Sequence, residues 1–340
     1  MHPVFKPSLI AAALIVSMGP ATAADRTALM NQCWPAAALT GTIEEKKITR
    51  GDRRFDAPPA AADLAPFDPV PLPYRGAIRR VKLPPGKKLL ALTFDLCELQ
   101  GEITGYDAAL VDYLRANNVK ATFFTGGKWM RSHPERTAQL MADPLFEVAN
   151  HAEAHRNLRL LSGDTLAAEI RGPQIAYEQT RAALSRSQCI KGQEAAFGSI
   201  PERMNLFRFP FGACNQASLD AVNDAGLLAI QWDLSTGDPT PAQSARAIAD
   251  AMIAAKPGSI IIGHGNGRGF HTSEALLTAI PALRAKGYDF VTVSELLAQG
   301  TPEISATCYD TRPGDTDKYD TFFKPRPPKP ETPPAEKKNE

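Results

Sequence analysis

The side chains of this sequence that could do chemistry sit at the ends of apolar runs in its middle part. They are Asp95, His151, His155, Arg208, Asp238 and His264. Each alone has an ordinary structural interpretation, because Asp often caps helices and a buried Arg or His is usually satisfied by an ion pair or a carbonyl. Their shared position is the stronger signal, since one edge of a sheet would collect them all.

Two histidines have the spacing of metal ligands. His151 and His155 form H-x-x-x-H in the segment NHAEAHRNL. Residues four apart lie on one face of a helical turn, so two imidazoles there can bind one divalent metal. We therefore predict a metal site, with a pair of surface or hydrogen-bonded histidines as the alternative.

The remaining candidates could take part in proton transfer. Asp95 could be a metal ligand or a base, and Arg208, inside an apolar run, needs a carboxylate partner. His264 precedes Gly265, Asn266 and Gly267, whose small side chains would let a ligand approach the backbone. We leave His271, which resembles a helix-entry residue, out of the site, and we place Trp232 in the core or the cleft wall.

The elements that position these residues alternate along the chain. The predicted strands are Leu89–Asp95, Ala121–Thr125, Phe146–Asn150, Leu206–Phe211, Leu227–Leu234, Ser259–His264 and Asp289–Val293. Helical patterns cover residues 107–117, 245–255 and 275–287; Thr240 is the predicted N-cap of the second, and Gly287 ends the third. Such alternation predicts an α/β fold: a closed or nearly closed barrel of about seven parallel strands, with an open doubly wound sheet as the alternative.

Composition restricts the class of protein. The 340 residues are 44% hydrophobic and 22% charged, with a net charge of +1, which is ordinary for a globular protein. Such balance gives no sign of nucleic-acid binding, and no glycine-rich phosphate loop is present.

The two ends of the chain differ from its centre. Lys6, the apolar run Leu9–Met18 and the A-T-A before Ala24 are typical of a secretory signal peptide. We therefore predict four segments: a signal peptide (1–23), an irregular N-terminal arm (24–85), the barrel (86–300) and a C-terminal extension with a Pro- and Lys-rich tail (301–340). The expected protein is exported, periplasmic or secreted, without stable membrane insertion.

The five cysteines are Cys33, Cys97, Cys189, Cys214 and Cys308. An exported chain can form disulfides, and an odd number leaves at least one thiol over. Spacing does not determine connectivity; Cys33 with Cys308 and Cys189 with Cys214 are two candidate pairs.

The order of these motifs carries a resemblance. The segments LTFDLCE, HAEAH, RFPFG, QWDLSTGDP and IIIGH are similar to the five motifs of the polysaccharide deacetylase family, the NodB-homology carbohydrate esterases. The resemblance runs from about Lys88 to about Leu297. It implies a distorted (β/α) barrel, a divalent metal, and hydrolysis of acetyl groups on carbohydrates; we expect zinc, with cobalt or another transition metal as alternatives.

The resemblance also implies a role for each matching residue. Asp95 corresponds to the general base, His151 and His155 to metal ligands, and Arg208 to the residue that holds the base. The backbone N–H of Phe211 corresponds to an oxyanion donor, and His264 to the general acid. Asp238 corresponds to the carboxylate paired with that acid.

The sequence departs from the family at two positions. Leu96 stands where the family has a second aspartate, the third metal ligand, and Pro239 stands where it usually has an aromatic cleft residue. We favour Glu98 as the replacement ligand; alternatively Asp95 becomes a ligand while another group acts as base, or Cys97 binds as a thiolate.

The predicted function is a metal-dependent hydrolase that removes acetyl groups from an N-acetylated glycan of the cell wall or a related glycan. The alternatives are a non-catalytic carbohydrate-binding relative and a hydrolase of the same fold that acts on another small-molecule C–N bond.

Overall fold

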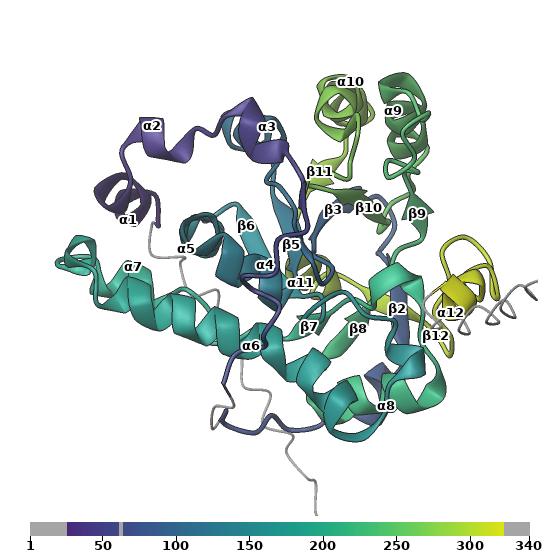
Figure 1. The fold of residues 1–340 in the computed structure, drawn as a ribbon. Coiled ribbons are helices and arrows are strands. Elements are labelled where there is room, and N and C mark those ends of the chain that lie inside the picture. Colours follow the sequence, from purple (N-terminus) through teal and green to yellow (C-terminus); the bar gives the residue numbers. More distant parts are fainter. Residues whose placement is uncertain (1–25, 61–63, 323–340) are drawn as a thin grey trace, which may run out of the picture.

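The computed structural model describes residues 26–60 and 64–322 (Figure 1). The predicted signal peptide and the Pro-rich stretch Lys324–Pro334 lie outside the described residues. Within the described part, no helix combines the length and the apolar character needed to cross a membrane.

A curled, mainly parallel sheet forms the centre. Its strands lie in the order β12-β2-β8-β7-β6-β5-β3-β10-β9, and β11 pairs with β3. Their bounds are β2 Ala77–Lys82, β3 Leu89–Leu96, β5 Ala121–Thr125, β6 Phe146–Asn150, β7 Leu206–Phe207, β8 Leu228–Ile230, β9 Leu234–Ser235, β10 Ile260–His264, β11 Asp289–Phe290 and β12 Thr301–Ser305. The bridge between Arg80 and Ser259 brings β2 back toward β10, so the sheet curls into a distorted barrel (Figure 1). The α/β barrel prediction is confirmed.

Three of the predicted strands are shorter than the sequence pattern by three residues or more, and β10 begins one residue later than predicted. Leu206–Phe211 ends at Phe207, before Pro210, which has no N–H to donate to a neighbouring strand. Leu227–Leu234 divides into β8 and β9, and Asp289–Val293 ends at Phe290, because Thr292 caps a following helix. The sheet also contains β2 and β12, which lie beyond the predicted barrel limits of 86 and 300.

Helices cover the outside of the barrel. They are α1 Arg26–Cys33, α2 Ala36–Leu39, α3 Ala108–Ala116, α4 Gly127–Ser132, α5 Pro134–Ala142, α6 Gly163–Ser185, α7 Glu194–Gly198, α8 Gln216–Asp224, α9 Ala245–Ile253, α10 Thr272–Ala285, α11 Val293–Leu297 and α12 Lys318–Phe322. Helix α9 starts at Ser244, whose side chain accepts the Ala247 N–H at 3.2 Å. Thr240 instead forms a turn that the Gln243 N–H closes, so its predicted role as the N-cap is wrong.

The segment before the barrel crosses the loop that follows β3. Strand β1 (Thr49–Arg50) pairs antiparallel with β4 (Glu102–Ile103) in that loop. The Lys46 ammonium lies 2.8 Å from the Asp107 carboxylate, and the Gly101 N–H donates to Asp56 at 2.9 Å. These contacts place the segment next to the carboxyl end of β3.

Two disulfides join distant parts of the chain. Cys33 in α1 pairs with Cys189, and Cys214 pairs with Cys308. Both pairings suggested by the sequence are therefore wrong, because helix α1 packs beside residues 188–190 rather than near the C-terminal extension. Cys97 is the free, buried thiol among the described residues.

Candidate active site

The alternation of side chains along β3 decides which of its residues face the inside of the barrel. Leu90, Leu92, Phe94 and Leu96 belong to the apolar cluster beneath the outer helices, whereas Ala91 belongs to the cluster inside the barrel. Because successive side chains of a strand point to opposite faces, Asp95 faces inward and Cys97 is next on that side. Leu96 points away from the site.

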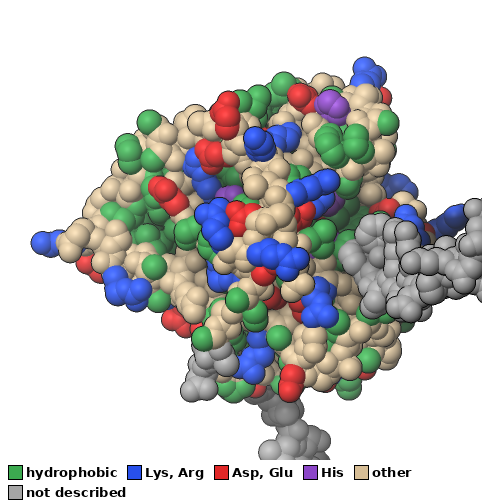
Figure 2. Space-filling model, viewed as in Figure 1, with side chains coloured by type: hydrophobic (Ala, Val, Ile, Leu, Met, Phe, Trp, Pro, Cys, Tyr) green, Lys and Arg blue, Asp and Glu red, His purple; other side chains and the backbone are tan. Residues whose placement is uncertain are grey.

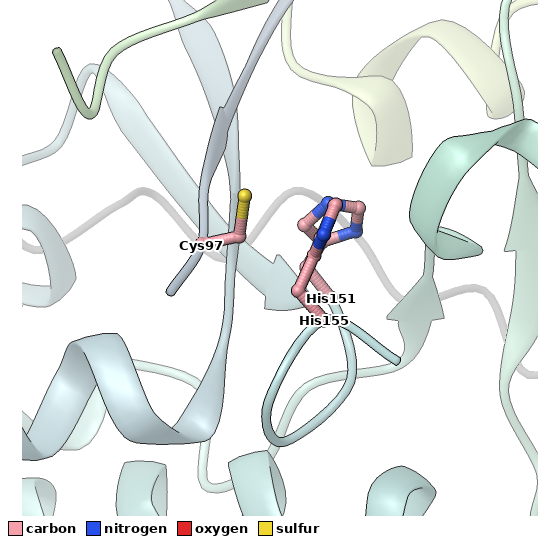
Figure 3. Close-up of side chains that lie close together, drawn as sticks. All are labelled: Cys97, His151 and His155. Carbon is pink, nitrogen blue, oxygen red and sulfur yellow. The ribbon is translucent and has the colours of Figure 1, made fainter. Parts of the chain in front are cut away.

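Three atoms that could hold a metal ion, here called the metal-binding group, lie at this end of the sheet. The Cys97 sulfur and one ring nitrogen each of His151 and His155 lie within 4.8 Å of one another. Figure 3 shows the three side chains converging from the end of β3 and the loop after β6. Two neutral imidazoles and a thiolate are ligands that zinc prefers, and three protein ligands leave a coordination position open.

The two histidines meet in a loop rather than on a helix. Residues 151–157 have no helical hydrogen bonding, and Ala152 and His155 have positive φ angles of 62° and 50°. The predicted helical turn is therefore wrong, although the loop brings the two imidazoles close together. The left-handed residues fold the loop back so that His155 returns to His151, with 5.0 Å between their ring centroids.

The hydrogen bonds of His151 orient its ring. Nδ1 lies 2.9 Å from the Arg208 carbonyl oxygen, which can only accept, so Nδ1 donates and Nε2 keeps its lone pair. Nε2 lies 3.3 Å from Oδ2 of Asp95. Burial lowers the pKa of His151, and it lowers the pKa of His155 well below the ordinary value. Two lone-pair atoms this close, one on a carboxylate, are stabilised by a cation between them.

Asp95 is buried and paired with a buried arginine. Nη1 of Arg208 donates to Oδ1 of Asp95 at 2.8 Å, and its guanidinium lies 3.9 Å from the Phe124 ring centroid. Burial by itself would raise the pKa of Asp95, but its electrostatic interactions with His151, Arg208 and His264 outweigh this effect and hold the pKa below the ordinary value. Asp95 is therefore a carboxylate at neutral pH.

His264 lies beside Asp95 and has its own carboxylate. The two residues are register partners in the adjacent parallel strands β10 and β3. Nδ1 of His264 lies 2.9 Å from Oδ1 of Asp238, whose Oδ2 accepts from the His264 N–H at 2.7 Å and from the Thr272 hydroxyl at 2.6 Å. Burial opposes protonation of His264, but the Asp238 charge outweighs it and raises the pKa.

Comparison with known proteins places this site in a family. Residues 82–230 match the family model described as polysaccharide deacetylase. This part of the chain resembles a polysaccharide deacetylase domain and is here called the deacetylase domain. The matched segment contains Asp95, both histidines and Arg208, while Asp238 and His264 follow it in the sequence.

A curated relative supports the same assignment. The peptidoglycan-N-acetylglucosamine deacetylase PgdA of Listeria monocytogenes is 26% identical over 212 residues, which are 62% of this chain and 39% of that protein. The chain therefore spans well under half the length of this relative.

Solved structures share the fold of the deacetylase domain. A peptidoglycan N-acetylglucosamine deacetylase crystallised with a benzamide ligand has a TM-score of 0.52 at 24% identity, covering 68% of this chain and 96% of the other. A variant of a Bacillus anthracis pseudoenzyme of carbohydrate esterase family 4 has a TM-score of 0.50 at 24% identity, covering 69% and 72%. The fold thus occurs in proteins named as a deacetylase and as a pseudoenzyme, so the side chains must decide the function.

Phe211 follows Arg208 at the mouth of the deacetylase domain. It lies in the 3-10 turn Pro210–Gly212 with a positive φ of 61°. Its ring contacts the ring of His155, with 4.3 Å between centroids. Its backbone amide therefore belongs to the same cluster of loops as the metal-binding group.

Glu98 lies apart from the two histidines. Its Oε1 accepts from the Thr104 N–H at 3.0 Å and from the Ser132 hydroxyl at 2.7 Å, and burial raises the pKa of this carboxyl to about 7. The group of metal-binding atoms contains Cys97 instead. Of the third ligands considered from the sequence, the structure brings Cys97 to both histidines and Asp95 to His151, and it leaves Glu98 beside Ser132 of α4.

Two other residues considered in the sequence lie as expected. His271 is partly exposed, and its Nδ1 lies 2.9 Å from the Glu274 carboxylate. Trp232 is buried inside the barrel, where its indole N–H donates to Asp310 at 3.0 Å. Sequence reasoning missed Thr272, which binds Asp238, because a threonine at a helix start signals a cap rather than an active-site contact.

Proposed function

We propose that this protein is a metal-dependent deacetylase of N-acetylated glycans. The observation that carries the proposal is the convergence of three kinds of group at one end of the barrel. The metal-binding atoms of Cys97, His151 and His155 adjoin a carboxylate held by Arg208, and the His264–Asp238 pair lies on the neighbouring strand. A protein that only bound sugar would not require a paired base and acid.

The three metal-binding side chains suit a divalent cation such as zinc. Both histidines are held neutral by burial, which keeps their lone pairs available. Burial also raises the pKa of the Cys97 thiol, so this side chain needs a cation nearby to become a thiolate. When bound, the metal would polarise the acetyl carbonyl and lower the pKa of a water molecule.

The protein side chains supply the proton transfers. Asp95, ionised and oriented by Arg208, accepts the proton of the attacking water. The Phe211 N–H donates to the oxyanion that forms on the carbonyl carbon, which is worth about 3 kcal/mol for one such donor. His264, protonated through Asp238, donates from Nε2 to the leaving amine nitrogen, and acetate and a free amino sugar result.

The best experiment measures acetate release and metal content together. N-acetylated chito-oligosaccharides and peptidoglycan fragments are supplied with zinc, cobalt or a chelator. We expect the chelator to abolish acetate release and His151→Ala to remove both metal and activity. His271→Ala is the matched control, because His271 is a partly exposed histidine outside the site, and this variant should change neither metal content nor activity. Activity that survives His151→Ala would refute the metal assignment.

A second pair of variants separates base from ligand. Asp95→Asn should reduce turnover about 10²- to 10⁴-fold while the metal stays bound, as expected for loss of a general base. His264→Ala should do the same as loss of the acid. Loss of metal in Asp95→Asn would instead make Asp95 the third ligand.

A non-catalytic glycan-binding protein is the second candidate. It is favoured by Leu96 in place of a ligand aspartate, together with the pseudoenzyme among the structures of the same fold. Binding of an N-acetylated oligosaccharide without acetate release under every metal condition would select this candidate.

We also propose that the protein works outside the cytoplasm. The signal-like residues 1–23 and the two disulfides support export, because disulfides persist in oxidising compartments. Detection of the chain in the periplasm or medium, beginning at Ala24, would test this.

A further inference from the structure

Residues 306–322, here called the C-terminal strap, lie after the last strand of the barrel and outside the matched family segment. Three sets of contacts fix the strap. The first is the disulfide between Cys308 and Cys214, which is three residues after Phe211. The second is Arg79, whose guanidinium stacks on the Tyr309 ring at 3.6 Å and donates to the carbonyls of Tyr309 and Asp310.

The third set binds the strap to the loop that carries His155. The Asn157 amide donates to Asp320 at 2.8 Å. The Arg159 guanidinium lies 2.9 Å from the carboxylates of both Asp317 and Asp320. Asn157 and Arg159 are two and four residues beyond His155, so helix α12 is fastened to the loop of a metal-binding histidine.

These contacts place one aromatic side chain at the site. The Tyr319 ring packs on the Phe211 ring with 4.9 Å between centroids, and Phe211 in turn packs on His155 at 4.3 Å. Tyr319 is only partly buried, and the neighbouring Lys318 is exposed. The strap therefore presents a partly exposed aromatic ring beside Phe211, and the side-chain ammonium of Lys318 lies 5.1 Å from the centroid of this ring.

We propose that the C-terminal strap forms one wall of the glycan-binding site and that Tyr319 contacts the sugar chain there. This inference rests on the proposed function and adds a specificity-determining residue to it. A pyranose ring presents an apolar C–H face, and a tyrosine ring offers a large, rigid surface that loses little conformational entropy on binding. The fixed strap keeps this ring in place before the glycan arrives.

The ring is too remote from the proton transfers to affect them directly. Two aromatic contacts separate it from the metal-binding histidine, and its hydroxyl has no assigned part in the reaction. Substitution of Tyr319 should therefore change KM and leave kcat and metal content nearly unchanged.

The test compares glycan binding by matched tyrosine variants. Calorimetry measures the Kd of N-acetylchitotetraose in the Asp95→Asn background, where the expected turnover is about 10²- to 10⁴-fold lower. Tyr319→Ala should weaken binding roughly tenfold, and Tyr319→Phe, which keeps the ring, should bind within about twofold of the parent. Tyr74→Ala is the control, because Tyr74 is an exposed tyrosine outside the strap. Its neighbour Arg75 pairs with Asp224, the last residue of α8.

The outcomes separate this inference from the proposed function. An unchanged Kd and KM in Tyr319→Ala would overturn the inference. Acetate release by the wild type would still support the proposed function in that case. Equal losses in Tyr319→Phe and Tyr319→Ala would also overturn it, because the ring would not be what binds. Tyr319-dependent binding without acetate release would uphold the inference and select the non-catalytic candidate. No glycan binding and no acetate release would refute both.

Folding is checked by the melting temperature and bound metal of every variant. If Tyr319→Ala is misfolded, Tyr319→Leu replaces it, since leucine fills the contact with Phe211 but has no ring. A folded Tyr319→Leu that binds as tightly as the parent would overturn the inference.

Discussion

The pairing of His264 with Asp238 sets the protonation state of the proposed acid. Both Asp238 oxygens are used, one on the His264 ring and the other on its backbone N–H and Thr272. Such complete use of a carboxylate holds the imidazole in one orientation, with Nε2 left to face the substrate. The pair therefore determines the upper pH limit of activity.

Asp238→Asn should shift that limit to lower pH. Asp238 raises the pKa of His264, and an acid works only while protonated, so activity falls as pH rises through this pKa. The uncharged amide removes the attraction, the pKa of His264 falls, and the alkaline limb of the kcat/KM profile moves down in pH. A pH profile of acetate release measures this, and an unmoved alkaline limb would show that His264 is not the acid.

Leu96 occupies the position at which the family carries an aspartate, yet its side chain is part of the core. It is fully buried in the cluster with Phe94 and Phe123. Leu96→Asp should therefore place a carboxylate among apolar side chains, lower the free energy of unfolding by roughly 3 kcal/mol or more, and leave metal affinity unimproved.

Thermal unfolding and metal titration test this expectation. Cys97→Asp is the informative comparison, because its carboxylate would arise on the inner face beside the histidines and should retain metal. Tighter metal binding by a stable Leu96→Asp variant would contradict the orientation of β3.

At the scale of elements, apolar runs made the strands predictable. Ala121–Thr125 matches its predicted bounds because both faces of this strand are buried. Phe146–Asn150 also matches its predicted bounds, although Glu147 and Val148 are only partly buried. Strand β2, with Arg79 and Arg80 inside it, has no such run and was missed. The residues at the ends of strands were identified for the same reason: a parallel sheet gathers them at one edge.

The conformations of the connecting loops could not be predicted in this way. The H-x-x-x-H spacing suggests a helix, yet the backbone adopts left-handed conformations at Ala152 and His155. Alanine rarely adopts this conformation, so the sequence gives no sign of it. Predicting the third metal ligand required knowing whether side chains continue to alternate between the two faces of the sheet beyond Leu96. This alternation decides whether Cys97 or Glu98 faces the histidines. The disulfide pairing could not be predicted because the paired cysteines are 156 and 94 residues apart in the sequence, and the tertiary fold decides which of them meet.

The Cys214–Cys308 disulfide is the element-scale connection between strap and site. Replacing both cysteines by serine removes a crosslink that closes 94 residues, for which chain entropy predicts a loss of about 4–5 kcal/mol of stability. We expect a lower melting temperature and a raised KM for the glycan, with metal content retained. The matched Cys33→Ser/Cys189→Ser variant should lose stability without the change in KM; equal KM effects in both would contradict a specific role of the strap.

At the scale of the whole molecule, segments from both ends of the described chain reach the carboxyl end of the sheet. Strand β1 pairs with β4 in the loop after β3, and the strap is fastened to the loops of Phe211 and His155. Acidic and basic side chains are interspersed over the face shown in Figure 2, in keeping with a net charge of +1. The site is therefore bordered by both extensions, and the balanced net charge gives little long-range steering of a substrate.

Cysteine chemistry tests the molecule as a whole. Four cysteines are paired, and the free Cys97 is buried within the metal-binding group. We expect the intact oxidised protein to contain one thiol, which reacts with an alkylating reagent only slowly while folded. Zinc should slow the reaction further and a chelator should speed it, because a bound cation uses the sulfur lone pairs that alkylation needs. Mass spectrometry of the alkylated protein identifies the residue. A Cys97 that reacts at the same rate with zinc and with chelator would remove it from the metal site, and the third ligand would then have to come from Asp95.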